Sequence, residues 1–254
     1  MRRLRDGLAF LYPLGLLLLV WEGAAGAGLV RPLFLPAASA VASKAIGLAL
    51  DGQIVGPLLT SLFRAFVGLS LAVVAGLALG IGMARVRCML WAFDPLIAIG
   101  FPSPKIAFLP IFILWFGIDH LSKVLLVAFT CVFPMVVSAY HGAAGVPQIW
   151  LWSARAMGTA ERRLLWRVVL PASLPYLFSG LRVAMPVALI TAFTAEMVAG
   201  GGGLGAALMF AQRFFETPTV FVYLSLMLLA GFVFDKLMLS LRRRAVGWQE
   251  EPTS

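Results

Sequence analysis

Six long apolar runs dominate this chain and limit the folds open to it. They cover approximately residues 8–25, 62–84, 92–117, 121–142, 172–199 and 218–241. A helix needs roughly 20 mainly apolar residues to cross about 30 Å of hydrocarbon, and most of these runs are that long. Lipid offers no hydrogen bonds to the backbone, and continuous apolar runs favour helices over the alternating strands of a barrel. The sequence therefore predicts an all-α polytopic membrane protein with about six transmembrane helices.

The composition agrees with this class, although the first run has a second interpretation. Hydrophobic residues make up 61% of the 254 residues and charged residues only 12%, so a soluble domain would lack polar surface. The first run follows a basic start, Met1–Arg5, and precedes a stretch rich in Gly and Ala, which also fits a secretory signal peptide. Cleavage would remove this run and leave the orientation of the others unchanged.

Basic residues predict the orientation of the spans. With the N-terminus in the cytosol, twelve of the twenty Lys and Arg residues fall in cytosolic segments and four fall outside. The twelve are Arg2, Arg3, Arg5, Arg85, Arg87, Arg155, Arg162, Arg163, Arg167, Arg242, Arg243 and Arg244, and the four are Arg31, Lys44, Lys123 and Arg213. Because cytosolic loops carry the excess of basic residues, both termini are predicted to be cytosolic. The net charge of +9 then follows from topology and attraction to anionic lipid, and needs no nucleic-acid partner.

We expect three parts along the chain. Residues 1–61 should hold the first transmembrane helix and an external interfacial segment, residues 62–245 a core transmembrane domain, and residues 246–254 a cytosolic tail. In the second run, Gly76 and Gly80 share a helix face, which predicts close packing.

The third run contains four prolines, which predict a kinked or broken helix. They are Pro95, Pro102, Pro104 and Pro110. Such a helix either lines a translocation path or simply bends in order to pack.

Motifs for catalysis are missing from the sequence. The four lysines follow Ser43, Pro104, Ser122 and Asp235, so no Gly-Lys pair and no Walker A loop occur. There is no HExxH motif, nucleophile elbow or clustered pair of carboxylates, and the histidines and cysteines lack metal-ligand spacing. We therefore expect neither catalytic residues nor a metal site in this chain.

The Arg-rich segment Trp152–Pro171 differs from the apolar runs on either side of it. It belongs to a loop, residues 147–171, whose apolar residues do not form one stripe at 100° per residue, so we predict two short helices. Gly158 should end the first helix, Thr159 should cap the second, and Pro171 should start the fifth run. This pair of helices is either a docking site for a soluble partner or an anchor in the lipid headgroups.

The spacing in this segment resembles a known signature. Gly158 is followed by nine residues, then Val168, one residue and Leu170-Pro171. This resembles the E-A-A-x3-G-x9-I-x-L-P loop of the inner-membrane permease subunits of bacterial ABC importers. Trp152 and Ser153 replace the Glu and the first Ala of that pattern, whereas Ala154 matches.

The resemblance covers roughly residues 30–245 and is similar to the nitrate, sulfonate and taurine branch of these permeases. It includes Leu35-Pro36, Asp94-Pro95, Leu109-Pro110, Leu114–Ile118, Leu174-Pro175, Gly180–Arg182, Thr194–Met197 and Gly203–Gly205. It implies a type I ABC importer permease fold with a cytosolic coupling helix, in the bacterial inner membrane.

The same resemblance implies partners for the chain. Two permease copies, as a homodimer, would form the pore, and cytosolic ABC ATPase subunits that bind ATP and Mg would dock on the loop. The residues implied in this contact are Ala154, Arg155, Ala156, Gly158, Thr159, Leu170 and Pro171. An extracytoplasmic substrate-binding protein would deliver a small anionic solute, such as a sulfonate, taurine or nitrate, or a pyrimidine precursor. This chain itself would carry no cofactor.

Charged and large residues within the spans are candidates for the translocation pathway. Lys105 either offers positive potential to an anionic solute or snorkels towards the headgroups. Glu196 either gates the pathway, pairs with a cation across the dimer, or forms a structural ion pair. Met185, Phe193 and Met197 either line the pore or pack in the core. An ATP-independent carrier or channel, and a scaffold subunit without a pathway, are the alternatives from other classes.

Overall fold

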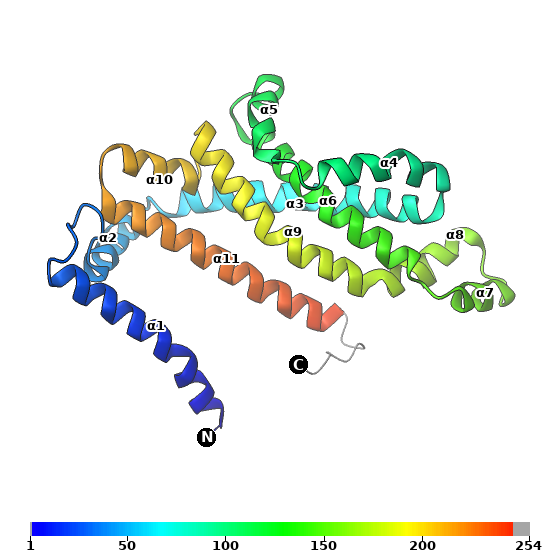
Figure 1. The fold of residues 1–254 in the computed structure, drawn as a ribbon, viewed down its shortest axis with the longest axis horizontal. Helices are drawn as coiled ribbons and strands as arrows, with labels where there is room; N and C mark the ends of the chain where they lie inside the picture. Colours follow the sequence, from blue (N-terminus) through cyan, green and yellow to red (C-terminus); the bar gives the residue numbers. More distant parts are fainter. Residues whose placement is uncertain (1, 246–254) are drawn as a thin grey trace.

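The structure, a computed structural model, describes residues 2–245, which are helical apart from short connections. The helices are α1 (Arg2–Gly26), α2 (Ala38–Leu50), α3 (Val55–Arg85), α4 (Arg87–Gly100), the 3-10 helix η1 (Lys105–Phe108), α5 (Leu109–Phe116), α6 (His120–Ala144), α7 (Gln148–Ala156), α8 (Glu161–Leu164), the π-helix η2 (Leu165–Val169), α9 (Leu170–Ala199), α10 (Leu204–Arg213) and α11 (Thr217–Ala245). Figure 1 shows their arrangement. The predicted tail, residues 246–254, lies outside the described residues.

In the described part of the chain, four helical segments are long and apolar enough to cross a membrane by themselves. They are α3, α6, the continuous run Glu161–Ala199 and α11. This confirms the second, fourth, fifth and sixth predicted spans. In α1 the apolar helical stretch Gly15–Gly26 is by itself shorter than a span, so the first span stays a prediction.

The third predicted span is broken, as its prolines indicated. α4 and the η1–α5 segment pass the length test only together, and they meet at a bend of 99° around Phe101–Pro104. Pro102 and Pro104 lack the N–H that would continue the helix through this point. Among the residues that the structure describes, this bent pair adds a fifth membrane-crossing segment if it is counted as one span.

In the core of the bundle, α6 packs between α3 and α9. A Cβ atom added at Gly76 would lie 2.5 Å from the Cβ of Met135, and one added at Gly80 would lie 2.5 Å from the Val136 carbonyl oxygen. These two glycines therefore let α3 and α6 approach closely, which confirms the predicted packing face.

The fifth predicted span starts earlier than expected. Pro171 does not begin it, because α8, η2 and α9 form one helical run of 39 residues. In η2 the Leu170 N–H donates to the Leu165 carbonyl five residues earlier. A proline ring crowds the carbonyl four residues before it, here that of Arg167, and the wider π turn lies at this point. The helix thus passes the proline without ending.

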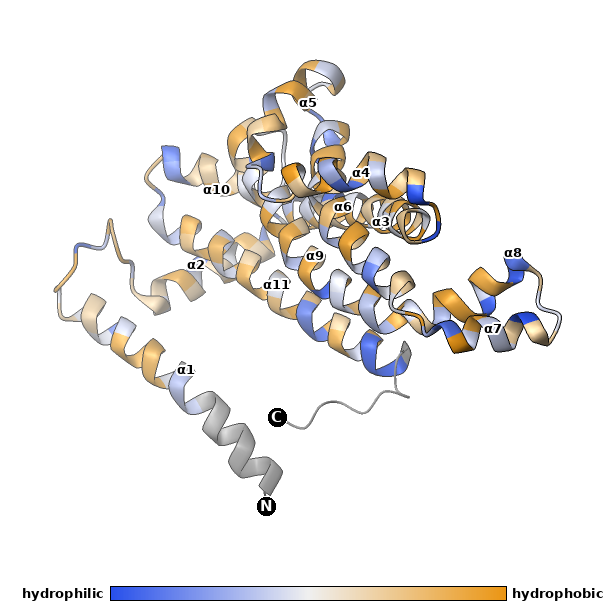
Figure 2. Cartoon of the chain, turned by 45° about the vertical axis from the view of Figure 1, so that its right-hand side comes forward, coloured by the Kyte–Doolittle hydropathy of each residue, from blue (hydrophilic) through white to orange (hydrophobic). Residues whose placement is uncertain are grey.

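The outer surface of the bundle is strongly apolar. Trp91, Leu114 and Leu228 are each more than 70% exposed, as expected where lipid or other subunits cover the protein. Hydrophilic residues lie in α8 and at the end of α11, and α7 carries both hydrophilic and hydrophobic residues (Figure 2). These are two of the basic segments that the sequence assigned to the cytosol.

Candidate functional site

The helices α7 and α8 form a projection, residues 148–164, at one end of the bundle (Figures 1 and 2). After α7 ends, Gly158 adopts a φ of +79°, which glycine reaches without strain. The Gly158 N–H donates to the Arg155 carbonyl at 2.9 Å, and the Thr159 N–H donates to the Ala154 carbonyl at 3.0 Å. This pair of bonds closes a helix C-terminus on a glycine and confirms the predicted turn.

The start of the second helix differs from the prediction. Ala160, not Thr159, is the N-cap residue of α8, and no side chain caps its free N–H groups. Thr159 lies one position too early, because its own N–H is held by the turn that ends α7. α8 is only four residues long and continues through η2 into α9.

An ion pair ties the two helices of the projection together. Arg155 Nε donates to Glu161 Oε1 at 2.7 Å, and Arg155 Nη2 donates to Glu161 Oε2 at 3.3 Å. The hydrogen bonds to Glu161, and then its negative charge, raise the pKa of Arg155, so the guanidinium stays charged. Both side chains are exposed and screened by solvent, so the pair contributes little to stability. Its consequence is a fixed geometry across the Gly158 turn.

The projection has a buried base and an exposed apolar face. Leu151 and Ala154 of α7 are buried against Leu164 and Val169, which fixes α7 to the run that becomes α9. Four large apolar side chains of the projection are each more than half exposed: Ile149, Trp150, Trp152 and Met157. Aromatic residues, Met and Arg are the residue types that protein interfaces favour.

The predicted coupling residues are divided between the tip and the base of the projection. Arg155, Ala156 and Gly158 are exposed at the tip, whereas Ala154 is buried. Leu170 and Pro171 lie in the first turn of α9, beyond the π turn. The structure therefore brings Ala154–Thr159 together and leaves Leu170 and Pro171 outside this group.

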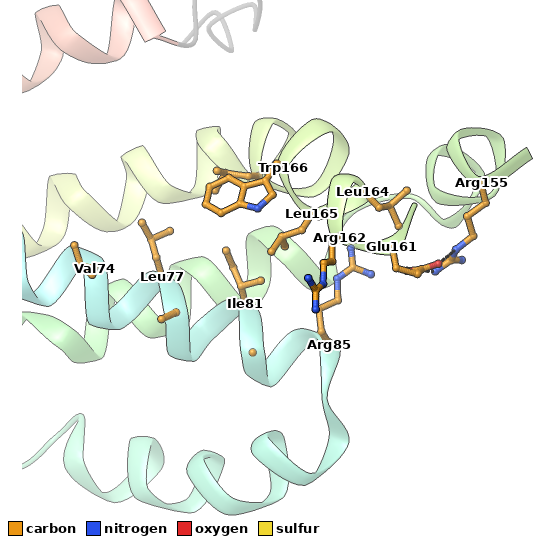
Figure 3. Close-up of a pocket in the computed structure, with 13 residues that line it drawn as sticks. Val74, Leu77, Ile81, Arg85, Arg155, Glu161, Arg162, Leu164, Leu165 and Trp166 are labelled. Atoms are coloured by element: carbon orange, nitrogen blue, oxygen red, sulfur yellow. Dashed lines mark hydrogen bonds and ion pairs between the residues drawn. The ribbon is translucent and has the colours of Figure 1, made fainter. Parts of the chain in front are cut away.

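A groove of about 850 Å³ lies between α3 and the α8–η2–α9 run (Figure 3). Apolar side chains of α3 and η2, among them Leu77, Ile81 and Leu165, form its walls. Its polar residues are Arg85, Arg155, Glu161 and Arg162. In Figure 3 the guanidinium groups of Arg85 and Arg162 lie side by side, while Glu161 turns towards Arg155.

At the other end of α3, sequence reasoning missed a buried polar network. Arg64 Nη1 donates to Glu196 Oε1 at 2.8 Å, and Ser61 Oγ donates to Glu196 Oε2 at 2.6 Å. The Gly205 N–H donates to the same carboxylate at 3.1 Å, and the Leu204 N–H donates to Ser61 Oγ at 2.8 Å. Arg64, Ser61 and Glu196 are all fully buried. The candidate pathway residue Glu196 thus forms an ion pair within its own chain.

The glycine run Gly200–Gly203 is the turn that the network holds in place. Its four residues have φ values between +68° and +96°. Arg64 donates to the carbonyl oxygens of Gly201 and Gly202 at 2.6 and 2.8 Å. A Cβ atom on Gly203 would collide with the Glu196 carboxylate. Glycine is therefore required here by both conformation and space.

A second buried cation, Lys123, lies next to this network. Its side chain is fully buried, and its Nζ donates to the carbonyl oxygens of Ile118 and Asp119. A charge inside an apolar run needs a partner, so the sequence signal for the network was Arg64 in the second run together with Glu196 in the fifth. Nothing in the sequence indicated that these two residues meet.

The other candidate pathway residues lie in two separate helices, Lys105 in η1 and the other three in α9. Lys105 is half-buried in η1, where its Nζ donates to the Phe101 carbonyl and lies 5.0 Å from the centre of the Phe133 ring. Met185 and Phe193 are buried in the core cluster, and Met197 is 36% exposed. The structure does not join these residues into one site, and their role in a pathway stays a prediction.

Within residues 2–245, no group of three or more His, Cys, Asp or Glu side chains is placed to hold a metal ion.

The sequence matches a known protein family over most of its length. Residues 68–247 match the family described as binding-protein-dependent transport system inner membrane component. The taurine transport system permease protein TauC of Escherichia coli (strain K12) is 32% identical over 243 residues, which cover 94% of this chain and 88% of TauC. The putative aliphatic sulfonates transport permease protein SsuC of Bacillus subtilis (strain 168) is 30% identical over 230 residues, covering 91% of this chain and 83% of SsuC.

The fold is also similar to a solved structure. An inward-facing structure of the MetNI methionine ABC transporter superimposes with a TM-score of 0.65 at 16% sequence identity, covering 74% of this chain and 94% of the solved one. At this identity the comparison supports the fold alone.

Proposed function

The chain belongs to the family of binding-protein-dependent transport system inner membrane components, the permeases of ABC importers, and we propose that it imports a small sulfonated solute by coupling to its ATPase through the α7–α8 projection. The permease is the non-catalytic, membrane-embedded subunit, and members of the family act with ABC ATPases and substrate-binding proteins. The names of TauC and SsuC support a sulfonate or taurine as the solute.

The observation that carries the coupling proposal is the form of the projection. It presents Trp152 and Met157 to solvent beside the charged Arg155, and an exposed apolar patch of this kind suits a protein partner. We place ATP and Mg in that partner, since the sequence contains no Walker A loop.

The connection from the projection to the membrane supports the same proposal. Leu151 and Ala154 pack on Leu164, which belongs to the helical run that continues into α9 without a break. A displacement of the projection would therefore reach the span directly. ATP shifts the permease between inward-open and outward-open conformations only if the ATPase binds these two conformations with different affinity.

We propose the assembly on the basis of the family resemblance, and the orientation on the basis of the basic residues. Two copies of the chain form the pore as a homodimer, and both termini and the projection lie in the cytosol because the basic residues are concentrated there.

Transport by purified components tests the proposal. The permease is reconstituted into vesicles with its ATPase and binding protein, and the uptake of labelled taurine and of an alkanesulfonate is measured with and without ATP. We expect accumulation only with ATP and with all components. Vesicles that contain this chain alone and accumulate solute without nucleotide would identify a carrier and overturn the proposal. Labelling of residue 160 from outside intact cells would overturn the orientation.

A further inference from the structure

The groove between α3 and the α8–η2–α9 run shares Arg155, Glu161 and Arg162 with the projection and continues along α3 away from it. It begins at Val74 on α3, ends at Arg85, and is closed on its other side by η2 and Leu170 (Figure 3). At a rise of 1.5 Å per residue, the distance along α3 from Val74 to Arg85 is about 16 Å. This is close to half of the roughly 30 Å hydrocarbon thickness, which is the depth of one leaflet.

The polarity of the groove changes along this length as it does along a phospholipid. The stretch from Val74 to Ile81 presents apolar side chains, and the arginines lie only at the end near Arg85. Trp166, which is 68% exposed, lines the same groove. Tryptophan is favoured at the level of the headgroups, where its indole has one apolar and one hydrated side.

The charges at the end of the groove are not balanced by the protein. Three arginines and one glutamate line it, and Glu161 is bound by Arg155 at 2.7 Å. Among the side chains that the structure describes, no carboxylate lies within ion-pair distance of Arg85 or Arg162. Two neighbouring guanidinium groups repel each other, and an anion between them removes this repulsion. Their planar donors match the oxygens of a phosphate.

We propose that this groove binds one anionic phospholipid of the cytosolic leaflet. An acyl chain lies along α3 from Ile81 towards Val74, and the phosphate accepts hydrogen bonds from Arg85 and Arg162. The proposal relies on the cytosolic orientation proposed above, but not on the identity of the solute or on ATPase coupling. A second copy of the chain is a poorer occupant, because its cytosolic side carries the same excess of arginine.

Bound lipid can be measured directly. The transporter is purified in mild detergent, supplied with equal amounts of phosphatidylglycerol and phosphatidylcholine, and the lipid retained per permease is measured by native mass spectrometry. We expect retained phosphatidylglycerol in the wild type and a roughly 30-fold weaker affinity in R85Q/R162Q, at about 1 kcal/mol for each basic residue removed. The matched control is R243Q/R244Q, which removes two exposed arginines at the end of α11 and should retain the lipid.

A second variant separates lipid from free phosphate. Ala78→Phe fills the apolar part of the groove and leaves both arginines in place, so it should expel the lipid. If the arginines bind only free phosphate, the wild type will retain inorganic phosphate instead of phosphatidylglycerol, and Ala78→Phe will not change the amount of phosphate bound; this result overturns the proposal. Loss of the dimer in Ala78→Phe, with no lipid mass in the wild type, would assign the groove to a second copy. If the control variant R243Q/R244Q loses as much phosphatidylglycerol as R85Q/R162Q, the proposal is also overturned. No nucleotide or solute is used, so a failed transport assay does not affect this result.

Discussion

The guanidinium of Arg64 lies 2.8 Å from the carboxylate of Glu196, and both side chains are fully buried. The pair joins α3 to α9 across 132 positions of the sequence. Hydrogen bonds from Ser61 and Gly205 complete the shell of the carboxylate, and two glycine carbonyls accept from the guanidinium. Removing one member of such a pair leaves an uncompensated charge in the interior, which costs far more than the pair itself contributes.

Glu196→Gln should therefore destabilise the protein strongly. The glutamine keeps the shape but leaves the Arg64 charge without its counter-ion, so we expect a loss of about 3–5 kcal/mol. In thermal unfolding of the detergent-purified protein, this corresponds to a melting temperature about 10 °C lower. Glu216→Gln is the matched control, because its ion pair with Lys44 is exposed, and it should change stability by less than about 1 kcal/mol. Normal melting with impaired uptake in Glu196→Gln would instead place Glu196 in the pathway.

Gly203→Ala should lower the stability of the protein more than Gly202→Ala does. Both residues have positive φ, so alanine is strained at either position, by about 1–2 kcal/mol. At Gly202 the added Cβ meets open space, whereas at Gly203 it meets the Glu196 carboxylate. Gly203 also has a ψ of 172°, in a region that only glycine adopts readily. Melting temperatures of the two variants test this order, and equal values would show that the carboxylate moves away freely.

Gly158→Val should uncouple the projection while the bundle stays folded. A β-branched residue is strained at a φ of +79°, whereas Asn tolerates this conformation, so Gly158→Asn is the control. We expect the valine variant to lower solute-stimulated ATPase activity severalfold, and the asparagine variant to stay close to wild type. Both should elute as intact dimers. Full stimulation in Gly158→Val would argue against coupling through this turn.

The ion pair of the projection should matter for coupling and hardly at all for stability. Arg155→Glu places two carboxylates at the Gly158 turn, so we expect an unchanged melting temperature and reduced ATPase stimulation. The double change Arg155→Glu with Glu161→Arg restores the attraction with reversed charges. If geometry alone is needed, stimulation recovers in the double variant. A double variant that stays inactive would show that the partner reads the charge of Arg155 itself.

The sequence was sufficient for features that depend on neighbouring residues. Apolar runs located α3, α6, α9 and α11, because lipid imposes a length and a composition on each helix separately. Prolines located the break between α4 and α5, and Gly158 located the end of α7. The N-cap of α8 was wrong by one residue, because the turn that ends α7 uses Thr159.

Features that depend on distant residues were not predictable in the same way. The ion pair of Arg64 and Glu196 and the groove between α3 and η2 join segments that are far apart in the chain, and Lys123 is buried beside that ion pair. Single-sequence reasoning shows that a charge in a span needs a partner, but it cannot choose that partner. The π turn before Pro171 was also missed, because proline is compatible with either a helix start or an accommodated bend.

Lys105 offers a test of the pathway itself. Its Nζ lies 5.0 Å from the centre of the Phe133 ring and 5.5 Å from that of Phe101, so the charge is held by aromatic faces and the Phe101 carbonyl rather than by a carboxylate. If this charge attracts the sulfonate group of the solute, Lys105→Met should reduce taurine uptake about tenfold, the value of one lost interaction of 1.4 kcal/mol. Lys105→Arg keeps the charge and the ring contacts, so it should preserve most of the uptake. A purely structural role predicts a lower melting temperature for Lys105→Met and equal uptake per folded transporter. Uptake is therefore normalised to folded protein, and an unchanged value for the methionine variant removes Lys105 from the pathway.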